Sequence, residues 1–406
     1  MRPVIIGAGI AGLAVAKGLR LLGWETEIYE QASELKPLGA GLSLSANALR
    51  ALRTLGLYEA VVAEAQPIHR LDLLDDKGQV LQSTDFQRFS QKYGHLSMAV
   101  LHRGDLHKAL LSELPRSIIR TEMECVDARQ VGDNIALRFA NGEIVESELV
   151  LACDGIHSAV RRALFPQSRE HFARYACWRA IAPGFLQGMD PARLTESWGA
   201  GKRIGLAAIP GERVYWFACC GADQRDDPRL ARADLAEVQA MFSGFHEPVP
   251  EVLDRTAEDS LIWTDILDLD PMPSFTRGRA VLLGDAAHAV TPDLGQGAGL
   301  ATEDAAVLAA LFGRLPADRA IREYDKRRLD RAHRVAAESR LYAKVAQWKN
   351  PLVVPLCNLL VKSIPERFMD RQLEAVLDNR FRACQGRRLA PAIKRTPIVQ
   401  FFLSAA

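Results

Sequence analysis

The feature that most constrains this chain is the segment from Val4 to Leu19, VIIGAGIAGLAVAKGL. Gly7, Gly9 and Gly12 form a G-x-G-x-x-G pattern directly after a short apolar run and before a helical pattern. In such a loop the first glycine permits a tight turn, the second lets the backbone approach a pyrophosphate, and the third lets the helix pack closely on the strand. The N–H groups at the start of the helix attract the anion. The segment therefore predicts a dinucleotide-binding strand, turn and helix.

An acidic residue follows at the spacing that this interpretation requires. A second predicted strand, ETEIYE, ends at Glu30, eighteen residues after Gly12. A carboxylate at that strand end can accept a hydrogen bond from a ribose hydroxyl. The alternative, a glycine-rich turn without a ligand, leaves the strand, the helix and the acid spacing unexplained.

Composition narrows the class of protein. The chain has 406 residues, more than one core usually supports, so at least two domains are expected. Its 51 basic and 50 acidic residues nearly cancel, and a net charge of +1 gives no reason to expect a nucleic-acid partner. Hydrophobic residues at 48% and charged residues at 25% are typical of a globular enzyme or binding protein.

Cysteine usage and apolar runs bear on location. No two cysteines form a C-x-x-C pair, so we expect reduced thiols, no disulfide framework and no metal site. The N-terminus lacks the charged and apolar regions of a signal peptide, and no run of eighteen apolar residues occurs. We therefore expect a cytoplasmic protein without a transmembrane segment. The seven cysteines are Cys125, Cys153, Cys177, Cys219, Cys220, Cys357 and Cys384.

The order of the predicted helices and strands indicates an α/β fold in which a discontinuous Rossmann-like domain carries an inserted, sheet-rich domain. Two hairpins are expected, with turns at Asp76–Gly78 and at Asn141–Gly142. Alternating segments such as YACWRAIAP and RVYWFACCG indicate half-buried strands between them and the C-terminal third. The predicted ranges are 1–68, 97–171 and 277–349 for the nucleotide-binding domain, 69–96 and 172–276 for the substrate domain, and 350–406 for a helical C-terminal segment and tail.

Three separated stretches point to one family. They are the glycine fingerprint with Glu30, the segment CDGIHSAVR from Cys153, and GDAAHAVTPDLGQG from Gly284. In this order they resemble the p-hydroxybenzoate hydroxylase fold, the single-component FAD monooxygenases, over about residues 1 to 350. The resemblance implies FAD as cofactor, NADH or NADPH as co-substrate, and transfer of one atom of O2 to a small aromatic molecule through a flavin C4a-hydroperoxide. The chain has no second G-x-G-x-x-G after a strand, as expected where the reductant docks only transiently.

The resemblance also assigns cofactor residues. The family holds the ADP half of FAD at the glycine fingerprint and the following acid, and it places an arginine near the flavin. Of two strand-end aspartates, the first borders both FAD and the nicotinamide nucleotide, and the second contacts the ribityl chain. A proline and a G-Q-G loop lie against the isoalloxazine ring, where N–H groups at a helix start can stabilise negative charge. By position these residues are Gly7, Gly9, Gly12, Glu30, Arg103, Asp154, Asp285, Pro292, Gly295, Gln296 and Gly297. His157 and His288 fall in structural parts of the motifs, so packing or capping roles are expected.

A finer resemblance concerns the substrate. GAGKRIGL and ERVYWFA resemble stretches of FAD-dependent urate hydroxylases and of alkylquinolone hydroxylases. In the urate type they bring an arginine and a tyrosine to the substrate, which implies Arg203 and Tyr215, with Asp293 and Pro292 completing the expected catalytic set. An arginine fork can hold a carbonyl or an anion, and a tyrosine can donate to a ring heteroatom. Asp293 departs from the quinolone type, which has asparagine. The alternative is that Arg203 forms a surface ion pair and Tyr215 fills the core.

Other functions remain open. A fused or N-heteroaromatic ring is the expected substrate, with epoxidation of a non-aromatic molecule, redox chemistry without oxygen insertion, or a flavoprotein sensor without turnover as alternatives. Flavin-dependent halogenases carry a W-x-W stretch, which this chain lacks. The apolar run from Pro351 to Val361 favours a helix packed on the FAD domain over a lip that contacts a membrane. A monomer or a homodimer fits these features equally.

Overall fold

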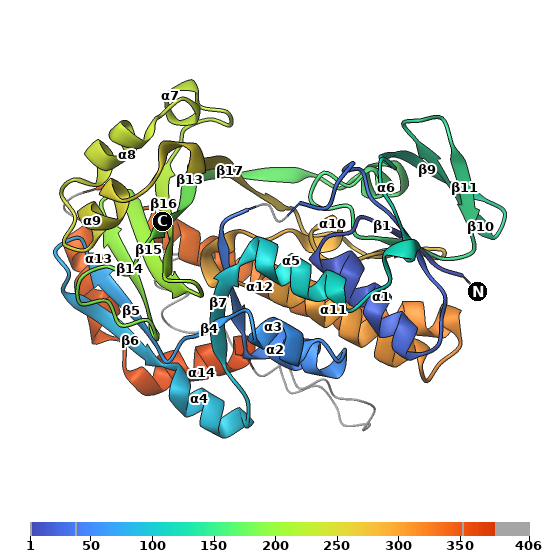
Figure 1. Ribbon diagram of the computed structural model, residues 1–406, viewed down its shortest axis with the longest axis horizontal. Helices are drawn as coiled ribbons and strands as arrows, with labels where there is room; N and C mark the ends of the chain where they lie inside the picture. The colour runs from blue at the N-terminus through green and yellow to red at the C-terminus, as the bar shows by residue number, and fades with distance from the viewer. Residues whose placement is uncertain (1, 37–38, 351–352, 378–406) are drawn as a thin grey trace.

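The structure, a computed structural model, describes residues 2–36, 39–350 and 353–377. Within these residues the strands form two large and two small sheets (Figure 1). The six-stranded sheet and the seven-stranded sheet lie at opposite ends of the molecule, and the long helix α12 (Ala317–Ala346) runs between them. The mixed α/β fold with a sheet-rich part and a helical C-terminal part agrees with the prediction.

The six-stranded sheet forms the predicted nucleotide-binding core. Its central strands run parallel and are buried, as expected for a parallel sheet covered on both faces. The apolar runs VII and LVLAC of the sequence supply two adjacent strands of this sheet. The strand order is β18 (Thr276–Arg277), β19 (Ala280–Leu282), β12 (Val150–Ala152), β1 (Val4–Ile6), β2 (Glu27–Tyr29) and β8 (Ile119–Arg120).

The seven-stranded sheet is mostly antiparallel and alternates in polarity. One face packs an apolar cluster with Trp178 and Trp216 under two short helices, and the other face carries polar and aromatic side chains toward the rest of the molecule. This alternation follows from the period of two in a β-strand. The strand order is β17 (Ile262–Leu269), β13 (Glu170–Pro183), β16 (Arg213–Gly221), β15 (Lys202–Ile209), β14 (Arg193–Gly199), β5 (Arg70–Asp75) and β6 (Val80–Asp85).

Two small sheets complete the strands. One lies between the large sheets and holds β3 (Gly41–Ser45), β7 (Met98–His102) and β4 (Gln66–Pro67). The other holds β9 (Cys125–Val131), β10 (Asn134–Phe139) and β11 (Ile144–Ser147). The predicted hairpin turns at Asp76–Gly78 and Asn141–Gly142 are confirmed, because they join β5 to β6 and β10 to β11.

The helices divide between the two large sheets. Helix α1 packs on α11, which in turn contacts α2 and α12, around the nucleotide-binding core. Helices α8 and α9 cover the outer face of the seven-stranded sheet. The helices besides α12 are α1 (Ile10–Leu21), α2 (Ala46–Thr54), α3 (Tyr58–Val62), α4 (Phe86–Tyr93), α5 (Arg103–Ser112), α6 (Ala159–Leu164), α7 (Pro228–Ala231), α8 (Leu235–Phe242), α9 (Val249–Asp254), α10 (Asp285–His288), α11 (Gly297–Phe312), α13 (Val353–Ser363) and α14 (Glu366–Leu377), with 3-10 turns at Arg116–Ile118, Glu258–Ser260 and η3 (Pro292–Leu294).

The predicted domain ranges stay a prediction, although β5 and β6 do join the strands of residues 172–276 in one sheet. The expectation for the apolar run is corrected. Helix α13 packs on the seven-stranded sheet rather than on the nucleotide-binding core: Cys357 and Val361 contact Leu73, Leu81 and Trp198. The tail from residue 378 onward, Cys384 included, lies outside the described residues.

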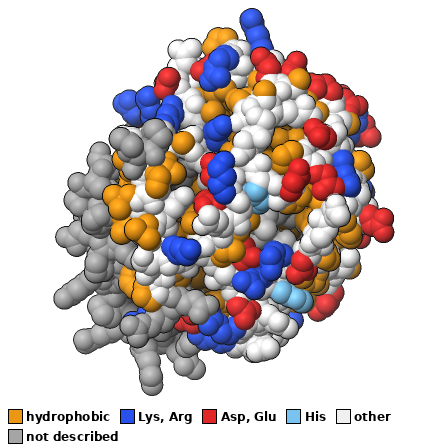
Figure 2. Space-filling model, turned by 90° about the vertical axis from the view of Figure 1, so that its left-hand side faces the viewer, with side chains coloured by type: hydrophobic (Ala, Val, Ile, Leu, Met, Phe, Trp, Pro, Cys, Tyr) orange, Lys and Arg blue, Asp and Glu red, His pale blue; other side chains and the backbone are white. Residues whose placement is uncertain are grey.

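The left-hand face of the molecule in Figure 1, shown in Figure 2, carries both apolar and charged side chains. Leu356 and Leu359 of α13 are 57% and 61% exposed. Hydrophobic, acidic and basic side chains are otherwise intermixed across the described part of this face (Figure 2). No helix among the described residues is both long and apolar enough to cross a membrane.

Candidate active site

The loop between β1 and α1 is shaped by its three glycines. Gly7 has a φ of +95°, and a Cβ there would lie 2.5 Å from the carbonyl oxygen of Cys153. A Cβ on Gly12 would lie 1.9 Å from the carbonyl oxygen of Gly7, so only glycine lets α1 pack against the loop. Nothing lies within 4 Å of the place where a Cβ on Gly9 would stand. Gly7 and Gly12 are therefore required by close packing, whereas Gly9 borders open space at the start of α1.

Glu30 lies beside this loop, immediately after β2. Its Oε2 accepts a hydrogen bond from the N–H of Ala8 (2.7 Å), and its Oε1 accepts one from the N–H of Ala32 (2.9 Å). The carboxylate thus fastens the glycine loop to the end of β2. Each carboxylate oxygen keeps a further lone pair, so a ribose hydroxyl can still bind. That contact stays a prediction.

Arg103 begins α5 and is exposed. Its aliphatic chain covers Gly39, where φ is +113° and a Cβ would lie 3.0 Å from Arg103 Cδ. Burial raises the pKa of Asp285, and the charges of His288 and Arg103 lower it by less, so the fold brings Arg103 and Asp285 into electrostatic contact across more than 180 positions of sequence. A guanidinium at this place can bind an anionic group.

Asp285 opens the short helix α10, after Gly284 with a φ of +58°. The residue is exposed, yet burial is the largest influence on its carboxylate and raises its pKa, while His288 and Arg103 lower it. Such a carboxylate can accept hydrogen bonds from ligand hydroxyl groups.

Asp154 follows β12, at the same edge of the six-stranded sheet as the glycine loop. Its Oδ2 accepts from the N–H of Val160 (3.3 Å). Its Oδ1 is buried and has no hydrogen-bond partner among the described residues. Burial raises the pKa of Asp154 against the hydrogen bonds from Ser158 and the backbone. A buried acceptor without a partner indicates a place for a donor from outside the chain.

The loop after α10 carries the predicted flavin contacts. Pro292 is exposed, and Gly295 adopts a φ of +61°, where a Cβ would lie 2.5 Å from Ser43 Oγ of β3. At Gly297, which begins α11, the nearest atom to a Cβ would be Asp285 Oδ1, at 4.0 Å. Helix α11 starts without a side-chain cap, so its first N–H groups are open to an anion or a partial negative charge.

Gln296 differs from the glycines on either side of it. Its side chain is buried and tied to the protein at both ends: Oε1 accepts from Asn47 Nδ2 (2.9 Å), and Nε2 donates to Ser45 Oγ (3.2 Å) and to the carbonyl oxygen of Leu294 (3.3 Å). These bonds hold the loop against β3 and α2. Any contact of Gln296 with a cofactor would therefore come from its backbone.

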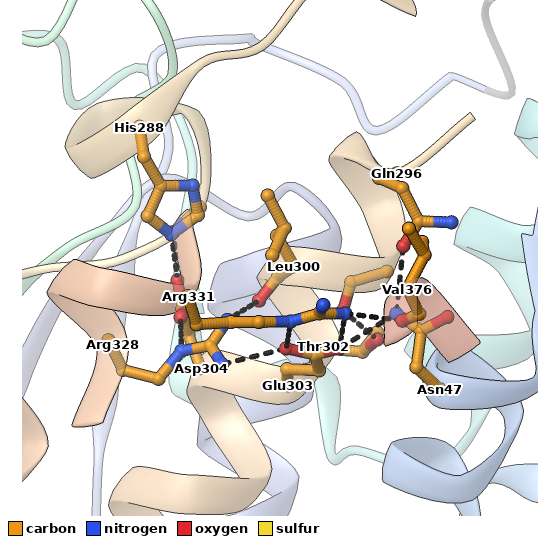
Figure 3. Close-up of polar contacts among 12 residues, drawn as sticks. Asn47, His288, Gln296, Leu300, Thr302, Glu303, Asp304, Arg328, Arg331 and Val376 are labelled. Atoms are coloured by element: carbon orange, nitrogen blue, oxygen red, sulfur yellow. Dashed lines mark hydrogen bonds and ion pairs between the residues drawn. The ribbon is translucent and has the colours of Figure 1, made fainter. Parts of the chain in front are cut away.

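Behind this loop lies a buried network of charged side chains, shown in Figure 3. Glu303 and Asp304 of α11 face Arg328 and Arg331 of α12. Arg328 donates to Glu303 Oε2 (2.7 Å) and to Asp304 Oδ1 (2.5 Å), and Asn47 donates to Glu303 Oε1 (2.7 Å). Burial raises the pKa of Asp304, but His288 and Arg328 outweigh it and hold the pKa at about 2. The network fixes α11, and with it the loop, relative to α12.

The two motif histidines have different surroundings. His288 is buried, its Nε2 forms a hydrogen bond with Asp304 Oδ2 (2.7 Å), and its ring meets Phe275 edge-on. The expected packing or capping role is confirmed for His288, as packing. For His157 it is wrong, because that side chain is exposed, its Nδ1 pairs with Glu170 (2.9 Å), and the cap of α6 is Ser158.

On the substrate side, Arg203 and Asp293 are bonded to each other. Arg203 is 2% exposed and donates to Glu196 Oε1 (2.8 Å) and Asp293 Oδ1 (2.6 Å). Tyr175 donates to the other oxygen of Asp293 (2.6 Å). Arg203 does form an ion pair, but the alternative that this pair lies on the surface is wrong, because both side chains are buried. This cluster joins the loop at η3 to the inner face of the seven-stranded sheet.

Tyr215 makes the second contact between that face and the rest of the site. It is half-buried, and a Cβ on Gly41 of β3 would lie 2.2 Å from its ring. Burial raises the pKa of Tyr215, and the neighbouring Arg179 lowers it by less. The hydroxyl therefore stays protonated at neutral pH and can donate.

Sequence reasoning missed three residues of this face: Tyr175, Arg179 and Glu196. Tyr175 and Arg179 share the inner face of β13 with Cys177, while the alternate residues Ala176 and Trp178 point to the outer apolar cluster. For Tyr175 and Arg179 the sequence did carry a signal. In YACWRAIAP, Arg179 interrupts an otherwise apolar strand and falls on the same alternate positions as Tyr175, which places both on one face.

The described residues contain no group of His, Cys, Asp or Glu side chains that could hold a metal ion. Cys125, Cys153, Cys177, Cys219, Cys220 and Cys357 are all free. Cys177 and Cys219 stand opposite each other on β13 and β16.

Comparisons with known proteins agree with this geometry. Residues 2–339 match the family described as FAD binding domain. The chain is 35% identical to the aurachin C monooxygenase/isomerase of Stigmatella aurantiaca, over 86% of this chain and 90% of the relative. It is 32% identical to the 2-heptyl-3-hydroxy-4(1H)-quinolone synthase of Pseudomonas aeruginosa, over 90% and 94%.

A solved structure shares the fold. The crystal structure of Klebsiella pneumoniae HpxO complexed with FAD and uric acid superposes with a TM-score of 0.84 and 24% identity, covering 93% of this chain and 96% of that one. The strand order and the placement of the glycine loop described above are therefore those of a known flavoprotein fold.

Proposed function

The chain belongs to the FAD binding domain family and is an FAD-dependent aromatic monooxygenase, and on that premise we propose that it hydroxylates a fused or N-heteroaromatic small molecule with NADH or NADPH and O2. Two relatives named for aurachin C and for a quinolone, together with a similar fold that binds uric acid, support this substrate class. A quinolone and uric acid each have a nitrogen-containing ring system.

One observation carries the proposal: an aromatic and polar sheet face stands opposite an uncapped helix start. Phe217 and Tyr215 lie on the inner face of the seven-stranded sheet, where a Cβ on Gly205 would come within 2.3 Å of the Phe217 ring. The same face reaches the η3 loop through Asp293. A flat ring between this face and the loop would meet aromatic carbon on one side and backbone N–H groups on the other.

We assign the cofactor to the backbone-lined side. The open space at Gly9, the unpartnered Oδ1 of Asp154 and the exposed carboxylate of Asp285 fit the pyrophosphate and hydroxyl groups of FAD. Glu30 and Arg103 complete this set. The chemistry that bound FAD supplies is hydride acceptance from NAD(P)H and activation of O2. The residues of the chain bind, orient and exclude water.

On the substrate side the residues have distinct proposed roles. Tyr215 donates its phenolic proton in a hydrogen bond to a ring heteroatom or carbonyl. Arg203 and Asp293 act through each other, because their buried ion pair holds the η3 loop, with Pro292 and Gly295, at a fixed distance from the sheet. In this arrangement Arg203 is a positioning residue.

Location and assembly are also part of the proposal. Free cysteines in the described residues support a reducing compartment such as the cytoplasm. A monomer or a homodimer would serve equally, because each predicted cofactor and substrate residue comes from one chain.

Oxidation of NADH and NADPH in air by the purified yellow protein tests the function. A panel of quinolones, purines, pyridine carboxylates and phenolic acids would be screened, with products weighed by mass spectrometry. A compound that accelerates oxidation and gains one oxygen atom supports the proposal. A product that is an epoxide of a non-aromatic compound, or FAD binding with no compound accelerating oxidation, would favour the epoxidase or the sensor instead.

A further inference from the structure

The backbone of Ala8, inside the glycine loop, is bonded to two side chains from distant segments. Its N–H donates to Glu30 Oε2 (2.7 Å), and its carbonyl oxygen lies 2.8 Å from Nε2 of His107 on α5. A carbonyl oxygen only accepts, so Nε2 of His107 carries the hydrogen and donates it. Ala8 is 2% exposed, so protein rather than water satisfies both of its polar groups. The loop is therefore held from the end of β2 and from α5.

The bond to His107 fixes the direction of the peptide group between Ala8 and Gly9. This peptide is trans, and in a trans peptide the carbonyl and the following N–H point in opposite directions. Because the carbonyl of Ala8 points to His107, the N–H of Gly9 points away from that side chain. Among the described residues no backbone carbonyl accepts a hydrogen bond from this N–H. It is therefore a donor that the loop offers outward.

This donor lies where the proposed cofactor site needs one. Gly9 precedes α1 as its N-cap, and no side chain caps the helix there. The first N–H groups of a helix have no acceptor within it, and together they can bind a pyrophosphate. An outward N–H at Gly9 adds to this set. If the peptide between Ala8 and Gly9 turned over, a carbonyl oxygen would face the anion in place of a donor.

The side chain of His107 is placed to act through the loop rather than on a ligand. It is partly buried, and its Nε2 is used by the bond to Ala8. Arg103, the predicted cofactor contact at the start of α5, lies four residues earlier. Residues four apart share a face of a helix. One face of α5 therefore carries both the arginine for the cofactor and the histidine that holds the loop.

We propose that His107 is a positioning residue for cofactor binding, which turns the N–H of Gly9 toward the pyrophosphate of FAD by donating to Ala8. This inference rests on the proposed function, because it takes the loop at Gly9 as a cofactor contact. It adds that the donor at Nε2, rather than the bulk of the ring, prepares the loop before FAD binds. A loop held in its binding conformation loses less entropy on binding.

The test compares two amides that differ in reach. The amide nitrogen of glutamine can take the place of Nε2 of histidine, whereas that of asparagine is one carbon shorter and does not reach Ala8. Apoprotein is titrated with FAD, and the dissociation constant is measured from the change in flavin fluorescence. We expect His107→Gln to stay within about threefold of the wild type. His107→Asn should bind FAD about tenfold more weakly, the effect of one lost hydrogen bond.

Two further measurements separate positioning from damage to the fold. The unfolding temperature of the His107→Asn apoprotein should lie within about 4 °C of the wild type, as expected for one neutral hydrogen bond. At saturating FAD the visible spectrum of its flavin should match that of the wild type, because the loop is proposed to serve the pyrophosphate and not the ring. His107→Leu, a better helix former without a donor, repeats the comparison if asparagine weakens α5.

A matched control lies at the next position of α5. The side chain of Lys108 is 62% exposed, and Lys108→Gln should leave the affinity for FAD unchanged. Equal affinities of His107→Gln and His107→Asn, whether both retained or both lost, would overturn the inference, because the donor would not decide binding. A loss in Lys108→Gln as large as that in His107→Asn would overturn it as well.

The inference and the proposed function can fail separately. If Gly9→Ala loses FAD but His107→Asn does not, the proposed cofactor site stands and the role of His107 is rejected. If His107→Asn weakens FAD binding and His107→Gln does not, while no compound yields an oxygenated product in air, the role of His107 stands and the hydroxylase is rejected.

Discussion

The proposed cofactor side and the proposed substrate side of this molecule differ in how far they depend on backbone atoms and on side chains. On the proposed cofactor side, the glycine loop, the start of α1 and the uncapped start of α11 offer backbone atoms, with side chains such as Glu30 and Asp154 beside them. On the proposed substrate side the groups are side chains at alternate positions of three strands, such as Arg179, Arg203 and Tyr215. Backbone contacts demand glycines at fixed spacing, whereas side chains on a sheet can be exchanged while the strands remain.

The proposed division would let relatives with different named substrates keep a similar fold. A steric error in the glycine loop should damage the fold and the cofactor site together, because the same atoms serve both. A change on the inner sheet face should be tolerated unless it breaks a buried ion pair. The following experiments test that division, from the largest expected effect to the smallest.

Arg203→Met should give the largest loss in the free energy of unfolding. It would show that a change on the substrate side can also damage the fold. The substitution leaves the buried carboxylates of Glu196 and Asp293 without their cation, which typically costs about 3–5 kcal/mol. Urea unfolding would measure the change in free energy. Arg193→Met removes a 41% exposed arginine whose buried partner, Asp72, keeps a second cation in Arg70, so it should cost less, about 1 kcal/mol. A loss below 1 kcal/mol for Arg203→Met would mean that its pairing contributes little to the fold.

Gly12→Ala and Gly9→Ala would sharpen the division within one loop. A Cβ at Gly12 meets a backbone oxygen at 1.9 Å, so we expect a loss of about 3 kcal/mol and little bound FAD. A Cβ at Gly9 meets no protein atom within 4 Å, so the apoprotein should keep its stability while FAD affinity falls. Thermal unfolding of both apoproteins and flavin absorbance per chain separate the two effects. Equal destabilisation by both substitutions would contradict the assignment of Gly9 to the ligand.

Acid should weaken the cofactor side through Asp304. The pKa of this carboxyl is about 2 in the folded chain and 3.8 ordinarily, because His288 and Arg328 outweigh the effect of burial. A carboxyl with a lowered folded pKa adds stability above its ordinary pKa and loses it as the pH falls toward the folded value. The contribution is on the order of 2 kcal/mol at neutral pH and should disappear between about pH 4 and pH 2. Unfolding free energies of the wild type and Asp304→Asn across this range check it, since the variant should lack that part of the slope.

Tyr215→Phe should have the smallest effect. Removing one hydroxyl that donates to a neutral ligand atom costs about 1 kcal/mol, or roughly fivefold in substrate affinity. The ring would keep its packing on Gly41, so the unfolding temperature and FAD content should not change. An unchanged substrate affinity would return Tyr215 to a purely structural role.

Much of the cofactor side could be predicted from the sequence, because its signal is local. Glycine spacing, strand-end acids and turn dipeptides are readable within a few residues, and β1, α1 and the two hairpins lie where these patterns place them. The direct contact of Glu30 with the glycine loop follows the same logic.

The substrate side was less predictable because its geometry depends on strand register. Whether Arg203 binds a ligand or Asp293 depends on which residues stand opposite it on neighbouring strands, some 90 positions away. Arg179 and Glu196 were missed for the same reason. Gln296 was assigned to the cofactor as part of its motif, but the side chain is tied to Asn47 and Ser45 of a distant segment.

The length of α12 has a consequence for motion. Its 30 residues span about 45 Å. Its first half is held by the carboxylates of α11, and its second half reaches the seven-stranded sheet, where Arg340 pairs with Asp268 and Tyr342 meets Trp198 edge-on. A continuous helix fastened at both ends resists bending between the two sheets. Entry and exit of small molecules should therefore depend on short loops and side-chain rotation on fast timescales, rather than on a slow hinge between large bodies.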